Sequence, residues 1–244
     1  MKMTDPSGEQ ALNLTLPEHI RFESNTDRAR LAGQLAKHIA TQLRYDIDAE
    51  GKATLVVSGG STPVAMFEQL SMLELDWSRV IITLADERWV SPEHKDSNTA
   101  LVQRHLLQNK AAAARFIPLW QPGSTAEEAV QACHERLSGL GKCISALILG
   151  MGNDGHTASL FPCSDDLNNA FACRQDCAAV TPATAPWPRI TLTPKRLLNS
   201  RLRVLYVCGN DKLETLAHAL DINDPKTMPV SLFLRQPLEI FWAP

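Results

Sequence analysis

The stretch ISALILGMGNDGHTASLFP, residues 144–162, places a short apolar run directly before a glycine-rich polar turn. The run, Ile144 to Leu149, is bounded by turn signals and predicts a central parallel strand covered on both faces. The turn has glycines at positions 150, 152 and 155, which let the backbone bend sharply and approach a ligand closely. Ligands of open α/β sheets bind beyond the carboxyl ends of the strands, so the turn predicts a functional site.

Asp154 and His156 are the two ionisable side chains of this turn. They lie where the chemistry of an α/β enzyme is expected. The alternative is structural: Asp154 caps a following helix and His156 is simply exposed. The Asp-Gly-His triplet alone fits both interpretations, so the rest of the chain has to distinguish them.

Strands and helices alternate along the rest of the chain. Apolar runs predict further strands over residues 53–57, 80–84, 116–119, 189–193, 203–208 and 238–242. Apolar residues at helical spacing predict helices over residues 26–45, 62–73, 97–107, 125–140 and 210–220. The alternation indicates βαβ units and a mainly parallel sheet. Because no long polar linker interrupts it, we expect one domain over residues 1–244, with a polar lead-in at 1–19.

Turn and capping residues define the expected boundaries of these elements. Asn25 or Thr26 is predicted to cap the first helix, and Pro63 to occupy the first position of the second. Residues 85–98 are expected to form a polar loop, and a second loop, rich in Asn, Asp and Pro, is expected after the glycine-rich turn.

Composition narrows the class of protein. The chain of 244 residues is 44% hydrophobic and 21% charged, as in ordinary globular proteins, and its net charge of −3 gives no general attraction to nucleic acid. The N-terminal residues lack an apolar signal core, and no run reaches the roughly 18 apolar residues of a membrane span. We therefore expect a cytoplasmic protein without nucleic-acid or membrane partners.

The six cysteines form no CxxC pair in a chain long enough to fold without disulfides. Free thiols are the expected state. Cys173 and Cys177 have the spacing of one helical face, which leaves a metal site there as the weaker alternative.

The segment VSGGSTP, residues 57–63, runs from a predicted strand through small residues into a predicted helix. Backbone N–H groups and hydroxyls at a helix N-terminus favour an anion such as phosphate. The segment lacks the lysine of a P-loop and the spacing of a dinucleotide fingerprint, which disfavours a nucleotide. A tight structural turn is the alternative. The candidate ligand contacts are Gly59, Gly60, Ser61 and Thr62.

The segment LADERWV, residues 84–90, places three charged residues at the end of a predicted buried strand, where unpaired charges are costly. Asp86, Glu87 and Arg88 form a self-contained surface ion pair in the simplest interpretation. In the functional one, Arg88 binds a ligand phosphate or a developing oxyanion, because its planar fork suits oxygen anions. Ser97 and Asn98 are expected to cap the next helix.

Two further cations lie near predicted strand ends. Arg189 begins the strand RITLT after a proline-rich loop, and Lys212 follows Gly209 at the start of a predicted helix. Each is a candidate contact for an anion. Their alternatives are a strand-end surface cation for Arg189 and a solvated helix residue for Lys212.

These motifs together resemble those of the 6-phosphogluconolactonase family, the lactonases of the pentose phosphate pathway. SGGSTP, DERWV with SN downstream, GMGNDGHTASLFP and RITLT occur in the family's order and approximate spacing, from roughly residue 20 onward. The resemblance implies a doubly wound α/β sheet with helices on both faces, shared with glucosamine-6-phosphate deaminases. It also implies hydrolysis of 6-phospho-D-glucono-1,5-lactone without a metal or other cofactor.

The resemblance also implies roles for individual residues. His156 resembles the catalytic base, Asp154 its acidic neighbour, and Arg88 and Arg189 the basic site residues. The sugar-phosphate loop corresponds to Gly59, Gly60, Ser61 and Thr62, and Asp86 and Lys212 complete the predicted substrate-binding set. The chain departs from many relatives at Ser91, where they have proline directly after the valine.

Lactone hydrolysis requires an activated water, a polarised carbonyl and an anchored phosphate. As a hypothesis, neutral His156 deprotonates the water, Asp154 orients the imidazole, and Arg88 stabilises the anionic oxygen. A helix beginning at His156 would lower the pKa of the imidazole through its dipole and keep it basic.

Other functions fit less well. An amino-sugar-phosphate isomerase or deaminase needs a further carboxylate after the turn, and residues 157–162 contain none. A non-catalytic sugar-phosphate sensor needs an additional domain. Serine and cysteine hydrolases need a GxSxG or a paired Cys–His signature, and neither is present.

Overall fold

A computed structural model describes residues 14–244, so most of the predicted polar lead-in lies outside the described residues. Seven strands, all parallel, form a large sheet in the order β1-β10-β9-β6-β2-β3-β5. Their bounds are β1 (Ile20–Ser24), β2 (Ala53–Val57), β3 (Val80–Leu84), β5 (Arg115–Ile117), β6 (Ile144–Leu149), β9 (Ser200–Cys208) and β10 (Leu238–Ala243). The predicted parallel sheet is confirmed.

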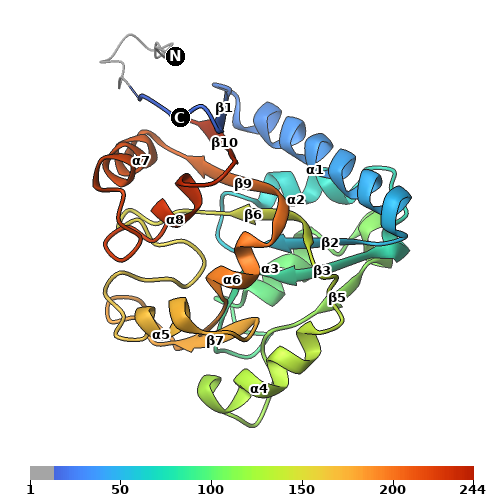
Figure 1. Ribbon diagram of the computed structural model, residues 1–244. Coiled ribbons are helices and arrows are strands. Elements are labelled where there is room, and N and C mark those ends of the chain that lie inside the picture. The colour runs from blue at the N-terminus through green and yellow to red at the C-terminus, as the bar shows by residue number, and fades with distance from the viewer. Residues whose placement is uncertain (1–13) are drawn as a thin grey trace.

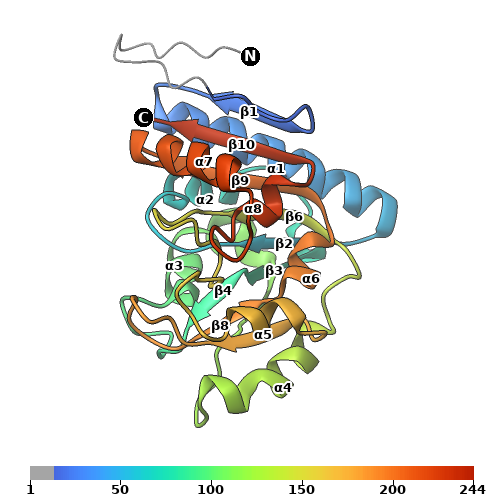
Figure 2. The same cartoon turned by 60° about the vertical axis from the view of Figure 1, so that its left-hand side comes forward.

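Helices cover both faces of this sheet. They are α1 (Arg28–Glu50), α2 (Val64–Ser71), α3 (Asn98–His105), α4 (Ala126–Leu137), α5 (Leu167–Ala172), α6 (Pro194–Leu198), α7 (Asn210–Ile222) and α8 (Ser231–Leu234), with 3₁₀ turns η1 (Trp77–Arg79) and η2 (Asn109–Ala113). Figures 1 and 2 show α1 along one face of the sheet and α7 on the opposite face. This arrangement confirms the doubly wound α/β fold. No helix among residues 14–244 is long and apolar enough to span a membrane.

Burial of apolar stripes explains why these segments pair as they do. Every residue of β2 and of β6 is buried, as expected for central strands with both faces covered. Helix α1 presents Leu31, Leu35, Ile39 and Leu43 to the core at intervals of about one turn, and each is at most 1% exposed. The helix therefore packs on the sheet along one continuous stripe.

The cap of α1 differs from the prediction. Asp27, not Asn25 or Thr26, caps the helix, because its carboxylate accepts hydrogen bonds from the backbone N–H groups of Ala29 and Arg30. Asn25 instead accepts from the Asp27 N–H, one step before the helix. Pro63 likewise lies at the N-cap of α2 and precedes its first turn.

A second sheet of three antiparallel strands was not predicted. It contains β4 (Asp86–Arg88), β8 (Arg189–Leu192) and β7 (Cys177–Val180), in the order β4-β8-β7. The expectation of a polar loop over residues 85–98 was thus wrong at β4, a strand of three charged residues without the alternation that marks a strand. The RITLT strand pairs here rather than in the large sheet.

The chain after the glycine-rich turn holds further elements that the sequence did not predict. Residues expected to form a loop contain α5 and β7, and α6 and α8 were also missed, as was β1 before the first helix. Cys173 lies at the C-cap of α5 and Cys177 opens β7, so they do not share a helical face. No group of three metal-ligating side chains occurs within residues 14–244.

The register of the parallel strands brings their carboxyl ends to one edge. Val57 at the end of β2 pairs with Leu84 of β3 and with Ile148 of β6, and Leu149 of β6 pairs with Leu205 of β9. The segments that leave these four strands therefore start side by side. The order in which strands are added to the sheet reverses between β2 and β6: after β2 the chain adds β3 and β5 on one side, and after β6 it adds β9 and β10 on the other.

Candidate active site

A cavity of about 440 Å³ lies at this edge, walled by the segments that follow β2, β3, β6 and β9. All but one of the predicted site residues line it: Gly59, Gly60, Ser61, Thr62, Asp86, Arg88, His156, Arg189 and Lys212. The exception, Asp154, lies behind His156 and contacts its imidazole. The structure therefore brings together residues that are spread over about 150 positions of the chain.

The glycine-rich turn holds His156 by a closed set of hydrogen bonds. The N–H of Gly152 donates to the carbonyl of His156 at 2.9 Å, and the N–H of Gly155 donates to the carbonyl of Gly152 at 3.0 Å. Gly155 has φ of 75°, which a residue with a side chain rarely adopts. A Cβ atom on Gly152 would overlap the imidazole of His156 and approach Asp154. Glycine is therefore required where the backbone passes beneath the histidine.

Asp154 orients the imidazole. Its Oδ1 accepts from Nδ1 of His156 at 2.6 Å and from the His156 backbone N–H at 3.1 Å. Burial by itself would raise the pKa of the Asp154 carboxyl, but the hydrogen bonds and charge of His156 outweigh it and hold that pKa below its usual range. Because the carboxylate only accepts, Nδ1 carries the proton and Nε2 carries the free lone pair.

No helix begins at His156, so the expected effect of a helix dipole on the imidazole is wrong. Thr157 and Leu160 form an isolated antiparallel bridge, and Ala158 between them has φ of 50°. A left-handed residue with a Cβ atom breaks the run of right-handed dihedrals that a helix needs. Asp154 therefore does not cap a helix either, and its role in the turn is the contact with His156.

Phe161 joins the histidine to an arginine and was not predicted as a site residue. The centroid of its ring lies 4.3 Å from the centroid of the His156 imidazole, with 32° between the two ring planes. The guanidinium carbon of Arg189 lies 5.4 Å from the same ring centroid, within range of a cation–π contact. The phenylalanine was visible within the quoted motif, but its sequence position gave no signal that it would contact both groups.

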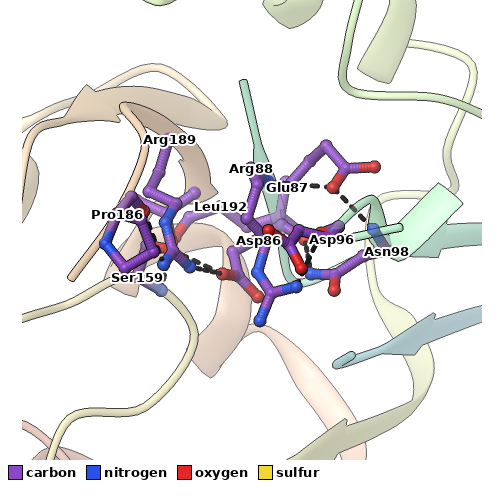
Figure 3. A network of polar contacts seen from close by, with 10 residues as sticks. Asp86, Glu87, Arg88, Asp96, Asn98, Ser159, Pro186, Arg189 and Leu192 are labelled. Atoms are coloured by element: carbon purple, nitrogen blue, oxygen red, sulfur yellow. Dashed lines mark hydrogen bonds and ion pairs between the residues drawn. The ribbon is translucent and has the colours of Figure 1, made fainter. Parts of the chain in front are cut away.

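Arg88 and Arg189 are directly opposite each other across the β4–β8 pair. Like charges in such a position repel, unless an anion lies between them. Asp86 supplies part of that charge: its Oδ2 lies 3.7 Å from Nη1 of Arg189 and accepts from Ser159 Oγ at 2.5 Å (Figure 3). Burial, and then the nearby Arg88, lower the pKa of Arg189, while Asp86 opposes them.

Both guanidinium groups retain donor capacity. Within residues 14–244, the buried Nε atoms of Arg88 and Arg189 have no hydrogen-bond partner. Arg88 donates from Nη1 to the carbonyl of Asp96 at 2.6 Å, and Arg189 from Nη2 to the carbonyl of Pro186 at 3.2 Å. Arg88 is thus not paired with Asp86 or Glu87 in a self-contained surface ion pair. Two guanidinium groups that line one cavity favour a ligand with oxygen anions.

Glu87 fastens β4 to the start of α3 rather than facing the cavity. One carboxylate oxygen accepts from the N–H groups of Arg88 and Asn98 (Figure 3). The other accepts from the N–H of Thr99 and the hydroxyl of Ser97. Burial raises the pKa of this carboxyl, against the lowering effect of the hydrogen bonds from Thr99 and Asn98. By accepting from the backbone N–H of Arg88, the Glu87 carboxylate fixes the position of the Arg88 main chain.

The loop after β2 forms the opposite wall. Gly59 packs so closely against the side chain of Asn98 that a Cβ atom would overlap it, and Gly60 has φ of 92°. Asn98 in turn donates to the carbonyl of Asp86 at 2.9 Å. Ser97, as predicted, caps α3. Asn98 lines the cavity, so the role foreseen for it at the helix start was incomplete.

The remaining wall comes from β9 and α7. Lys212 lies in the first turn of α7 and donates to the side-chain oxygen of Asn153 on the glycine-rich turn. Its Nζ also lies 3.8 Å from Oδ2 of Asp211. The cavity residues that sequence reasoning missed include Ser58, Tyr206, Val207 and Cys208, because they belong to apolar or small-residue stretches without a charge pattern.

Comparisons with known proteins agree with this geometry. Residues 26–242 match the family model of glucosamine-6-phosphate isomerases/6-phosphogluconolactonase. The chain is 45% identical over 233 residues to a 6-phosphogluconolactonase of Pseudomonas aeruginosa. The alignment covers 95% of this chain and 98% of that protein. It is also similar to the crystal structure of a 6-phosphogluconolactonase from Shewanella baltica, with a TM-score of 0.91, 45% identity, and 94% and 100% of the two chains covered. A monomeric glucosamine-6-phosphate deaminase shares the fold, with a TM-score of 0.75 at 17% identity over 91% of this chain and 97% of the other.

Proposed function

Because this chain belongs to the family of glucosamine-6-phosphate isomerases and 6-phosphogluconolactonases, we propose that it hydrolyses 6-phospho-D-glucono-1,5-lactone to 6-phospho-D-gluconate. The reaction is the lactone-hydrolysing step of the oxidative pentose phosphate pathway. The observation that carries the proposal is the oriented His156, which lines the same cavity as Arg88 and Arg189.

His156 is the general base. Its Nδ1 proton is held by Asp154, so Nε2 is the atom that takes a proton from water. The water oxygen forms a bond to the lactone carbonyl carbon, and the carbonyl oxygen becomes an anion. The charge that develops on the imidazole is stabilised by the Asp154 carboxylate, whose lowered pKa keeps it ionised at neutral pH.

Collapse of the tetrahedral intermediate breaks the bond between the carbonyl carbon and the ring oxygen. The imidazolium then returns its proton to that oxygen, which becomes the hydroxyl of the open chain. The new carboxylic acid ionises to give the product. His156 thus ends neutral, ready for another water, and the net change is the addition of one water molecule.

The cations divide between two oxygen anions. Arg88 stabilises the developing oxyanion, and Arg189, Lys212 and the loop of Gly59 to Thr62 bind the phosphate. The distribution of these groups around the cavity supports the division, since the loop and Lys212 flank it from β2 and β9. A fixed phosphate holds the ring carbonyl near the base, which converts binding energy into orientation.

The related isomerase or deaminase reaction finds less support. The segment after His156, residues 157–162, supplies hydroxyls and apolar groups but no carboxylate. Ser159 within it is committed to Asp86, and Thr157 donates to the carbonyl of Gly150 at 2.8 Å. Incubation with glucosamine 6-phosphate should therefore release no ammonia.

Replacing His156 with Asn tests the base directly. The variant should lose about 10²- to 10⁴-fold in kcat for the phosphorylated lactone, the usual contribution of general base catalysis, with little change in KM. Stopped-flow detection of the released acid measures the rate, and the melting temperature controls for folding. Near-normal turnover in a folded variant would remove His156 as the base.

The phosphate requirement gives a second test. Unphosphorylated glucono-1,5-lactone should react with a kcat/KM lower by about 10²-fold or more, because it forgoes the charge-assisted bonds that orient the substrate. The two lactones are compared in the same assay after subtraction of spontaneous hydrolysis. Equal kcat/KM values would contradict a phosphate site in the cavity.

A further inference from the structure

Two loops outside the cavity each hold one of its arginines. Nη1 of Arg88 donates to the carbonyl of Asp96, in the loop of residues 91–97, and Nη2 of Arg189 donates to the carbonyl of Pro186, in the loop of residues 182–188. These backbone carbonyls fix where the guanidinium groups lie. The separation of the two groups therefore depends on the separation of the two loops.

One side-chain hydrogen bond ties the loops together. The indole Nε1 of Trp187 donates to Oδ2 of Asp96 at 3.1 Å, and the indole packs edge-on against His94, with ring centroids 5.2 Å apart and planes at 75°. We call this contact the Trp187–Asp96 latch. Asp96 thus accepts from both sides: its carboxylate from the indole, and its main-chain carbonyl from Arg88.

The latch holds a backbone that would otherwise relax. Trp187 has φ of 73°, a left-handed conformation unusual for a bulky residue, and it directly precedes Pro188, which further restricts it. Such residues persist only where their surroundings hold them in place. Trp187 is 41% exposed, so burial contributes only part of that restraint, and the hydrogen bond and the edge-on contact with His94 supply the rest.

Repulsion between the arginines gives the latch something to resist. Arg88 and Arg189 face each other across β4 and β8, with Asp86 close to Arg189. Without a ligand between them, the two guanidinium groups repel each other, and moving them apart lowers the electrostatic energy. A bond between the loops that carry them opposes this separation. The N–H of Trp89 adds a second tie, to the carbonyl of Pro188 at 2.8 Å.

We propose that Trp187 and Asp96 are positioning residues for substrate binding: their latch holds Arg88 and Arg189 at the spacing that the oxygen anions of one ligand require. The inference rests on the proposed function, in which both arginines bind anionic oxygens of the substrate. Neither latch residue lines the cavity, so neither acts as a catalytic residue.

Trp187→Phe keeps an aromatic ring beside His94 and removes the indole N–H together with the pyrrole part of the ring. This variant should bind 6-phosphogluconate roughly five- to tenfold more weakly, and its KM for the lactone should rise by a similar factor, within the range of coupling seen between contacting residues. Calorimetry gives the dissociation constant. The melting temperature should stay close to that of the unsubstituted protein, since the lost bond is exposed.

A matched control removes an indole hydrogen bond elsewhere. Trp77 also donates from Nε1 at 3.1 Å, to the carbonyl of Leu73, and it does not line the cavity. Trp77→Phe should leave 6-phosphogluconate affinity unchanged. In addition, one of the five indole N–H signals in a ¹⁵N spectrum should shift when 6-phosphogluconate is added and be missing from the Trp187→Phe spectrum.

Asp96→Ala completes a double-mutant cycle. If the latch is one interaction, Asp96→Ala and Trp187→Phe weaken binding by similar factors, and the double variant is no weaker than either single one. Additive losses, or wild-type affinity in Trp187→Phe, would overturn the latch. Trp187→Gly, which suits the left-handed backbone but lacks the indole, should show the same weakening and guards against misfolding of the first variant.

Arg189→Leu separates failure of the latch from failure of the proposed function. If Arg189→Leu binds 6-phosphogluconate as tightly as the unsubstituted protein, the arginine is not a ligand contact and the proposed function loses its anchor. If Arg189→Leu loses binding while Trp187→Phe does not, only the latch is wrong.

Discussion

At the residue scale, the pair of Asp154 and His156 illustrates how a local turn orients the proposed base. The imidazole is fixed from three sides: by Asp154 at Nδ1, by the ring of Phe161, and by the backbone of Gly152 below it. Only Nε2 is left to act on a substrate. The sequence predicted the first of these contacts, since Asp154 is two residues away, but not the second, because the Phe161 contact depends on the left-handed Ala158.

Asp154→Asn should lower kcat, and it should also lower the melting temperature by an amount that depends on pH. A neutral amide no longer stabilises the imidazolium and is free to present its NH₂ to Nδ1, which reverses the tautomer, so kcat should fall by about 10²-fold or more. The pKa of Asp154 is lowered on folding, so its ionised form stabilises the fold above the ordinary Asp pKa of about 3.9.

The stability difference should therefore be constant near neutral pH and disappear as the pH falls through the lowered pKa of the folded protein. Calorimetric melting temperatures between pH 3 and 7 measure it. Asp48→Asn, which removes an exposed carboxylate of α1, controls for the loss of one charge. A difference between the Asp154→Asn variant and the unsubstituted protein that widens in acid would contradict the assigned direction of the shift.

At the scale of elements, the segments that leave the strands matter more than the strands themselves. β2, β3 and β6 were predicted with their observed bounds, because runs of apolar residues between turn signals leave little choice. β4 was not, since three charged residues carry no strand pattern. It forms because Glu87 satisfies the N–H groups at the start of α3 and because β8 supplies a partner edge.

Two glycines of the same turn give a matched pair of variants. A Cβ atom on Gly152 would overlap the imidazole of His156, whereas one on Gly150 would meet no atom within 4 Å in the described structure. Gly152→Ala should displace the histidine and lower kcat by about 10²-fold, as small misplacements of catalytic groups do. Gly150→Ala should retain most of the activity.

Steady-state assays and melting temperatures of the two variants separate misplacement from unfolding. The expected pattern is a folded Gly152→Ala protein with a low kcat. Equal activities of the two variants would show that the close approach of Gly152 to His156 has no catalytic importance.

At the scale of the whole molecule, the site exists because four parallel strands end in register at one edge. That much was predictable from the order of strands and helices, and it placed nine of the ten predicted residues around one cavity. The second sheet was not predictable, because it pairs Arg88 with Arg189, residues about a hundred positions apart that show no shared local pattern. Tertiary pairing, not local preference, decides such contacts.

The order of strands in the large sheet also has a consequence for the ribosome-bound chain. β10 lies between β1 and β9, and its first residue, Leu238, pairs with Ile20 of β1. Among residues 14–244, β1 pairs with β10 alone, so in the growing chain it waits for residues 238–243 before it gains this partner. During that interval its backbone groups lack the partner strand that they have in the folded protein. Closure of this edge is thus a late, non-local step of folding, and a nascent chain stalled before residue 238 exposes β9 as an open edge.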